Sequence, residues 1–220
     1  MSDHSSSPSL MILFTAYLRA NFELMPHVSA MIQRMRSALV AENPRPILIL
    51  DLGGAWNEES WECQVTENRA PYLVLDAMSY AAVNADGLAV EDIMGMQETV
   101  QMRLLENTMP ARWKWRDMTV YLGPHAAAPA VTWALDDPPF DGAIGVTENG
   151  CLRLYPQTGA LGFVEAAWPS LEIIQAKTIP LSWDIRPDPS IVACVEFVQR
   201  EAKSYAERNS RSQNQEEADE

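Results

Sequence analysis

Cysteine, histidine and basic residues are all scarce in this chain of 220 residues. It has three cysteines and three histidines, and 16 lysines and arginines stand against 30 aspartates and glutamates. The cysteines (Cys63, Cys151 and Cys194) are odd in number, widely spaced and without a CxxC pair. This pattern favours reduced, buried thiols over a disulfide framework or a cysteine-based zinc site.

The shortage of positive charge limits the partners of the protein. Its net charge of −14 repels duplex nucleic acid and anionic lipid, which carry the same sign. We therefore expect neither a nucleic-acid nor a membrane partner. The acidic surface instead favours a protein partner or self-association.

Long apolar runs are also missing. The first nine residues, MSDHSSSPS, are polar, and the apolar run 10–14 is too short for a signal-peptide core. No other run approaches the roughly 18 apolar residues that cross a bilayer, so we expect a cytoplasmic protein.

Apolar residues are nevertheless abundant, at 47% of the chain, which is enough for a sizeable core. We predict one domain over residues 10–206. It lies between a disordered N-terminus over 1–9 and a disordered acidic tail over 207–220, which has five acidic residues and two arginines.

Strands and helices alternate in the first part of the chain. The run 10–15 predicts a buried strand, apolar spacings of three and four predict a helix within 23–41, and 47–50 predicts a second strand. A crossover of this length makes the two strands parallel neighbours. The pattern then predicts a helix over 71–78, a strand over 81–85, a helix over 88–109, a strand over 118–122, a helix over 126–135 and a strand over 140–146.

Shorter β-like runs, separated by glycine and proline, follow over 151–155, 161–168 and 171–181. Asp188 and Pro189 then open a helix whose apolar face comprises Ile191, Val195, Val198, Ala202 and Tyr205. The expected fold is α/β, with a two-layer β-sandwich core flanked by helices in an α/β/β/α arrangement.

The order of residues at three strand ends resembles the calcineurin-like metallophosphoesterases, specifically their 5′-nucleotidase and UDP-sugar hydrolase branch. Residues 12–26 read ILFTAYLRANFELMP, where that branch reads ILHTNDLHGNFEPLP. Residues 47–54 read ILILDLGG for its LLLDAGD, and residues 75–90 read LDAMSYAAVNADGLAV for its MNALGYDAVTLGNHEF. Residues 140–145 lie where the family has a strand ending in GGHTH, and 186–190 resemble the opening of its final helix. The resemblance covers roughly residues 10–205 and implies the fold of that family.

The resemblance also implies a chemistry in which Asp, His and Asn side chains hold two metal ions that activate a water. Here the family's Asp-x-His falls on 17–19 (Tyr-Leu-Arg), the aspartate of its Gly-Asp pair on Gly54, and its Asn-His on 87–88 (Gly-Leu). Its later Gly-His-x-His falls near 145–148, which has no imidazole, and His125 alone lies close to a family histidine. The ligand motifs are therefore degenerate, and we predict no resident metal.

These losses predict a pseudo-enzyme that acts as a binding or scaffold subunit. Its vestigial cleft would present six candidate ligand-binding residues: Tyr17, Arg19, Asn21, Asp51, Asp86 and His125. A guanidinium suits a phosphate or a carboxylate, so we hypothesise that Arg19 occupies the vacated metal position and either pairs with Asp51 or binds a small anion.

The alternative is a metal-dependent phosphoester hydrolase with a non-standard site. Its two divalent ions would be held by Asn21, Asp51, Asp76, Asp86 and His125, with Asp51 and His125 as the catalytic residues. Three of these residues also have structural interpretations. Asn21 can cap the first helix, Asp51 can accept hydrogen bonds from turn amides, and Asp86 with Gly87 can form a turn.

Overall fold

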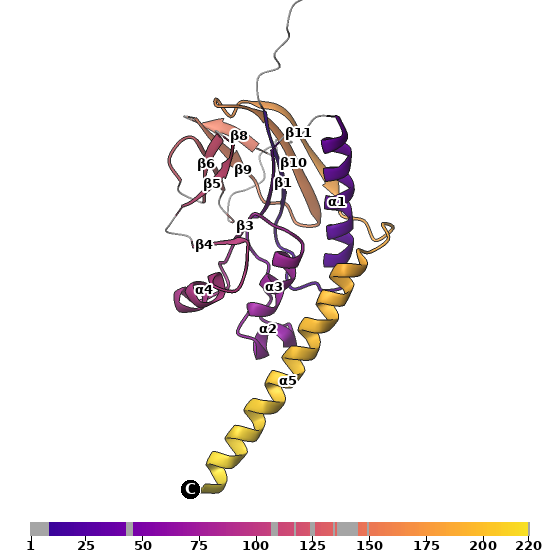
Figure 1. Ribbon diagram of the computed structural model, residues 1–220, viewed down its shortest axis with the longest axis vertical. Coiled ribbons are helices and arrows are strands. Elements are labelled where there is room, and N and C mark those ends of the chain that lie inside the picture. The colour runs from indigo at the N-terminus through magenta and orange to yellow at the C-terminus, as the bar shows by residue number, and fades with distance from the viewer. Residues whose placement is uncertain are drawn as a thin grey trace, which may run out of the picture.

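A six-stranded sheet forms the centre of the computed structural model, which describes residues 9–42, 46–106, 110–116, 118–123, 126–133, 135, 145–148 and 150–219 (Figure 1). Its strand order is β11-β10-β1-β2-β3-β4. Strands β1 to β4 run parallel to one another, whereas β10 is antiparallel to β1 and β11 to β10. The bounds are β1 (Ser9–Thr15), β2 (Ile47–Asp51), β3 (Ala82–Asn84), β4 (Arg103–Leu105), β10 (Ala160–Ala167) and β11 (Ile173–Pro180).

A second sheet of five strands packs against the first, in the order β5-β6-β7-β9-β8. Its strands are β5 (Ala111–Trp115), β6 (Met118–Leu122), β7 (Ala130–Trp133), β8 (Gly145–Glu148) and β9 (Cys151–Leu154). The helices are α1 (Met25–Glu42), α2 (Trp61–Val65), α3 (Arg69–Ala77), α4 (Val90–Gln97) and α5 (Pro189–Asp219). This arrangement confirms the predicted α/β class and the two-sheet core.

Two apolar cores lie on the two faces of the six-stranded sheet. In β1, Met11 and Leu13 pack with residues of the helices, while Ile12 and Phe14 pack with the second sheet. Because both faces of β1 are covered, its sequence is continuously apolar, as is typical of buried parallel strands. Most of the buried helical residues belong to the first core, so the helices cover the outer face of the six-stranded sheet.

The parallel register brings the carboxyl ends of β1, β2 and β3 to one edge of the sheet. Thr15 pairs with Asp51, and Asp51 pairs with Val83. The last residue of each strand and the loop that follows it therefore meet at this edge, which we call the carboxyl edge. In open α/β sheets this is the edge where ligands bind.

Two predicted helices are wrong. The helix expected over 88–109 is limited to α4, and β4 follows it as the edge strand of the six-stranded sheet. The helix expected over 126–135 contains the strand β7, which pairs with β6 and β9. These long-range pairings override a local composition rich in alanine. Of the strand expected over 140–146, residues 140–144 lie outside the described part, and β8 begins at Gly145.

The last helix buries its predicted face, with Ile191, Val195, Val198 and Ala202 in or against the core. It begins where we predicted, because the Ser190 amide donates to Asp188 Oδ1 at 2.9 Å. It then continues to Asp219 through the segment predicted to be a disordered tail, and it projects beyond the body of the molecule (Figure 1). Within the described ranges, none of the helices combines the length and the apolar character needed to span a bilayer.

Candidate binding site at the carboxyl edge

Three buried side chains form a hydrogen-bonded row below the carboxyl edge. Thr15 Oγ1 donates to Asp51 Oδ2 at 2.7 Å and lies 2.8 Å from the Tyr80 hydroxyl. The other carboxylate oxygen, Asp51 Oδ1, accepts from the Gly53 amide at 3.0 Å. This last bond confirms the predicted turn-amide role of Asp51. Since the Asp51 side chain has no exposed surface, both of its oxygens are used inside the protein.

Burial raises the pKa of Asp51 to about 7. The hydrogen bonds from Thr15 and Gly53 act in the opposite direction, and the nearby charge of Asp86 raises the pKa further. Burial, followed by the charge of Asp51, also raises the pKa of Tyr80. Near neutral pH a substantial fraction of Asp51 is therefore protonated, which makes it a weaker ligand for a cation than an ordinary aspartate.

Asp86 is the second carboxylate at the edge, and it holds the loop that follows β2. The Gly54 amide donates to both of its oxygens at 3.1 Å. Asp86 is partly buried, and this burial raises its pKa against the opposing hydrogen bonds from Gly54 and Trp56. The sequence did not predict this bond, because it joins residues 32 positions apart.

Aromatic rings lie against Gly54 and Gly87, the two glycines at positions where the family resemblance implies metal ligands. Gly54 has φ +68°, and a Cβ on it would lie 2.7 Å from Tyr17 Cδ1. A Cβ on Gly87 would lie 2.0 Å from Trp56 Cδ1. Both distances are shorter than real Cβ contacts, so these backbone positions have no room for a metal-binding side chain while the rings keep their places.

Tyr17 and Arg19 both follow β1, but the Tyr17 side chain bonds within the protein and the Arg19 side chain is exposed. The Tyr17 amide donates to Gly53 O at 2.8 Å, and its hydroxyl donates to Leu135 O, so Tyr17 links the two sheets. The Arg19 amide donates to Gly54 O at 3.0 Å, but the Arg19 side chain is exposed. The hypothesis that Arg19 pairs with Asp51 is therefore wrong, because Asp51 is fully buried and bonded to Thr15 and Gly53. Anion binding by Arg19 stays a prediction.

Two further candidates have structural roles. Asn21 Oδ1 accepts from the Leu24 amide at 3.0 Å, which confirms its predicted role at the start of α1. Asp76 accepts from the amides of Gln101 and Met102 at 2.9 and 2.8 Å, just before β4 begins. Because β4 is parallel to β3, Asp76 lies at the opposite edge of the sheet from Asp51 and Asp86. His125 lies outside the described residues.

Sequence reasoning missed Asn84, which ends β3 and is 1% exposed. Its Nδ2 donates to Leu52 O at 3.1 Å, and its Oδ1 is buried without a partner among the described atoms. A polar residue at the end of an otherwise apolar strand was the available signal. Thr15 and Tyr80 were missed for a different reason, since each looks ordinary until the fold brings it to Asp51.

The described residues do not fit the two-metal centre that the resemblance implies. They contain no group of three or more His, Cys, Asp or Glu side chains placed to hold a metal ion. Asp51 and Asp86 already accept hydrogen bonds from Gly53 and Gly54, and Asp76 lies at the other edge. What the arrangement provides is a rigid, internally bonded edge with an exposed guanidinium at its rim.

Comparison with known proteins identifies the fold. No protein-family model and no curated protein sequence matches this chain. Among solved structures, it is similar to the sulfate thiohydrolase SoxB of Thermus thermophilus in complex with glycerol, with a TM-score of 0.61 and 9% sequence identity. The match covers 92% of this chain and 62% of that one, so this chain spans less than two thirds of the length of SoxB. At this identity the likeness shows the fold alone.

Proposed function

We propose that the protein is a catalytically degenerate relative of the metallophosphoesterases that acts as a binding or scaffold subunit. The observation that carries this proposal is the pair of aromatic rings at the former ligand positions. Tyr17 lies against Gly54 and Trp56 against Gly87, at the two places where the family resemblance puts an aspartate and an asparagine. In this proposal the two rings take the space that larger side chains at these glycines would need.

The hydrogen bonds of the two remaining carboxylates support the same proposal. Asp51 is fully buried, with Thr15 and Gly53 donating to its two oxygens, and the Gly54 amide donates to the Asp86 carboxylate, so both carboxylates already have partners within the protein. These bonds fix the loops after β2 and β3. In this proposal the edge has kept the architecture of a phosphoesterase while its polar groups hold the fold.

Arg19 and the acidic surface define what such a subunit would bind. Arg19 is exposed beside the edge and would take a small anion, since its guanidinium presents a fork of donors to a phosphate or carboxylate. The net charge of −14 favours a basic protein partner. Self-association is the other arrangement consistent with a scaffold role.

One observation favours the alternative, a metal-dependent phosphoester hydrolase. The fold is similar to that of a protein named as a hydrolase, SoxB. In this alternative Asp51 and His125 would be the catalytic residues, and two divalent cations would supply the activated water. Asp51 would first have to release its hydrogen bonds to Thr15 and Gly53.

The experiment that decides between these functions measures hydrolysis of 4-nitrophenyl phosphate and bis(4-nitrophenyl) phosphate with Mn²⁺ present. We expect no turnover above that of the Asp51→Asn variant, whose folding is verified by circular dichroism. Turnover that is lost in both Asp51→Asn and His125→Ala would overturn the proposed function and establish the alternative.

A further inference from the structure

Among the described strands, β4 is one edge of the six-stranded sheet, and α4 lies beside it (Figure 1). Alternate residues of a strand in a parallel ladder face the same neighbour, so Arg103 faces β3 while Met102 and Leu104 face outward. The Arg103 amide donates to Ala81 O at 3.0 Å. The outward groups bond to the last residue of α4, since the Leu104 amide donates to Gln97 Oε1 and Gln97 Nε2 donates to Met102 O, both at 2.9 Å. One carboxamide therefore covers both groups.

These two bonds are the ones that one residue of a further parallel strand would make. In a parallel ladder, a residue opposite position i bonds to the carbonyl of i−1 and to the amide of i+1. Leu105 shows this pattern on the inner side of β4, where it lies opposite Asn84 and accepts from the Ala85 amide at 3.0 Å. Gln97 repeats the pattern on the outer side around Arg103, with its carboxamide in place of a peptide group.

Another side chain covers the remaining outward amide of this edge. Asp76 Oδ1 accepts from the Met102 amide at 2.8 Å and from the Gln101 amide at 2.9 Å. Both outward amides, those of Met102 and Leu104, are therefore bonded to side chains of the helical layer.

The opposite edge of the sheet, β11, is protected in a different way. Its pairing with β10 shifts register beside Ile174, Lys177 lies in its middle, and Pro180, which has no amide hydrogen, ends it. Bulges, lysine and proline are the devices that keep the edges of natural sheets from pairing with other chains. β4 reads Arg-Leu-Leu and pairs with β3 without a register shift, so it has none of these devices.

The space outside Gln97 has room for another strand. A cleft of about 590 Å³ lies between α4, β4 and the start of β5, and Gln97 and Leu104 are among the residues that line it. On its α4 side Val90 is 47% exposed and Met94 is 70% exposed. A strand that displaced the carboxamide would find backbone partners on β4 and apolar contacts on α4.

We propose that Gln97 is an edge cap, which keeps the six-stranded sheet from joining that of a second copy of the chain. A second copy is the strand donor to be excluded, because it presents the same β4 edge at the concentration of the protein itself. Two such edges related by a two-fold axis would pair antiparallel and extend the sheet across both copies. The cap goes beyond the proposed function and does not depend on it, since it lies away from the carboxyl edge.

Sedimentation velocity over a range of concentrations tests the cap. Gln97→Ala removes both bonds, and Gln97→Met removes them while filling nearly the same space. We expect both variants to dimerise at a concentration at least about tenfold below that of the natural chain, because no cap bonds have to break first. The matched control is Gln101→Ala, the same substitution at an exposed side chain just before β4, which should behave like the natural chain.

Hydrogen exchange then locates the new contact. In dilute solution the Leu104 amide should exchange faster in Gln97→Met than in the natural chain, because it has lost its acceptor. At concentrations where the variant is dimeric, the same amide should become protected again. A purely structural role of Gln97 would speed exchange at every concentration. Circular dichroism verifies that the variants are folded.

Two results would overturn the proposal. The first is a concentration of dimerisation that is the same for Gln97→Ala, Gln97→Met and the natural chain. The second is association that leaves the Leu104 amide unprotected or that Gln101→Ala shares, because the contact would then lie elsewhere. Neither result concerns metal binding or phosphoester turnover, so failure of the cap and failure of the proposed function are told apart by separate measurements.

Discussion

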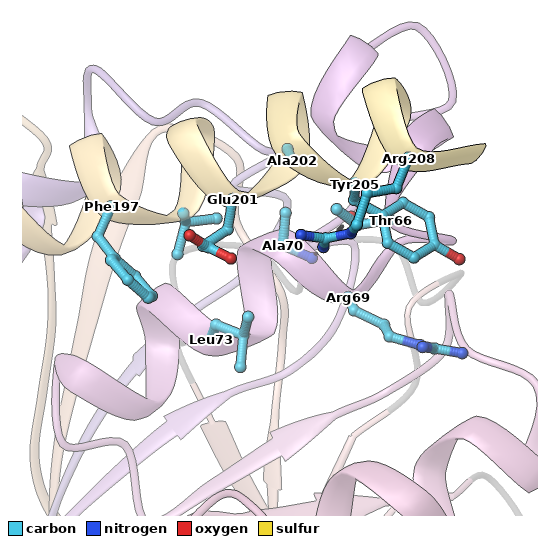
Figure 2. A pocket seen from close by; sticks show the side chains of 10 residues that line it. Thr66, Arg69, Ala70, Leu73, Phe197, Glu201, Ala202, Tyr205 and Arg208 are labelled. Carbon is cyan, nitrogen blue, oxygen red and sulfur yellow. Dashed lines mark hydrogen bonds between the residues drawn. The ribbon is translucent and has the colours of Figure 1, made fainter. Parts of the chain in front are cut away.

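The carboxyl edge and the α3/α5 groove, which lies between α3 and α5 and is lined by Leu73 and Phe197 (Figure 2), differ in which side chains they bury and which they expose. At the edge, polar groups that would serve a ligand in an enzyme are buried and bonded within the protein, as Asp51 is to Thr15 and Gly53. In the groove, apolar groups that would serve the core remain half exposed, as Phe197 does. The comparison teaches that polar groups at a sheet edge can serve to hold the fold, while large apolar side chains elsewhere on the same molecule stay open to solvent.

Among changes at the carboxyl edge, removing the Asp51 carboxylate should produce the largest loss of stability. Asp51→Ala leaves the Gly53 amide and the Thr15 hydroxyl without their buried acceptor, and we expect a cost of about 3 kcal/mol in the free energy of unfolding. Urea denaturation followed by tryptophan fluorescence measures it. The exposed Asp184→Ala change is the control and should cost less than about 0.5 kcal/mol. Equal free energies of unfolding for Asp51→Ala and Asp184→Ala would contradict the structural role of Asp51 at the carboxyl edge.

The raised pKa of Asp51 makes stability depend on pH. Its folded pKa of about 7 exceeds the ordinary value of 3.8, so the folded state holds a proton that the unfolded state has released. The stability from this group is complete below the unfolded pKa and is lost as the pH rises through the folded pKa. By linkage, this loss amounts to about 2 kcal/mol between about pH 5 and pH 7.5. Denaturation at these two pH values should show a steeper fall for the natural chain than for Asp51→Asn; parallel profiles would contradict the assigned pKa.

Asn21 should show a smaller effect, because its role is to cap one helix. Asn21→Ala removes the side-chain acceptor of the Leu24 amide, and we expect a loss of about 1 kcal/mol. Asn21→Asp keeps an acceptor and should restore most of this stability. If Asn21 served a ligand instead, both variants would keep full stability.

The smallest effect should come from the groove. Phe197→Glu changes a residue that is 50% exposed, so the free energy of unfolding should shift by less than about 0.5 kcal/mol. Its neighbour Val198 is 4% exposed, and Val198→Glu buries an unpaired carboxylate, which should cost about 3 kcal/mol or more. Urea denaturation of Phe197→Glu and Val198→Glu measures this difference between an exposed side chain of the groove wall and a buried one of its floor. A large loss for Phe197→Glu would mean that the wall belongs to the core.

The sequence predicted the central elements of the fold because their signals are local. The apolar run of β1 and the helical spacing of Ile191, Val195 and Val198 can be recognised without knowledge of any partner strand. The strands β4 and β7 were missed because nothing local distinguishes them. β4 has three residues, and β7 follows an alanine-rich stretch, so only pairing with neighbouring strands defines them.

The site could be predicted only in part for the same reason. The hydrogen bond from Gly53 to Asp51 spans two residues, and the cap of Asn21 spans three, so both could be expected from turn chemistry. The bond between Asp51 and Thr15 joins two strands, and the bond between Asp86 and Gly54 joins the loops that follow β3 and β2. These bonds depend on the register of the sheet. The predicted ion pair between Arg19 and Asp51 is wrong because Asp51 bonds to Thr15 and Gly53 instead.

The central claim is that the carboxyl edge holds the fold and does not form a catalytic metal centre. Its most direct test is a Mn²⁺ titration of the purified full chain, followed by electron paramagnetic resonance, with Asp51→Asn titrated in parallel. We expect the two proteins to give the same weak binding, because Asp51 already bonds to Thr15 and Gly53. Tight binding of about two Mn²⁺ ions per chain, abolished by Asp51→Asn, would contradict the account.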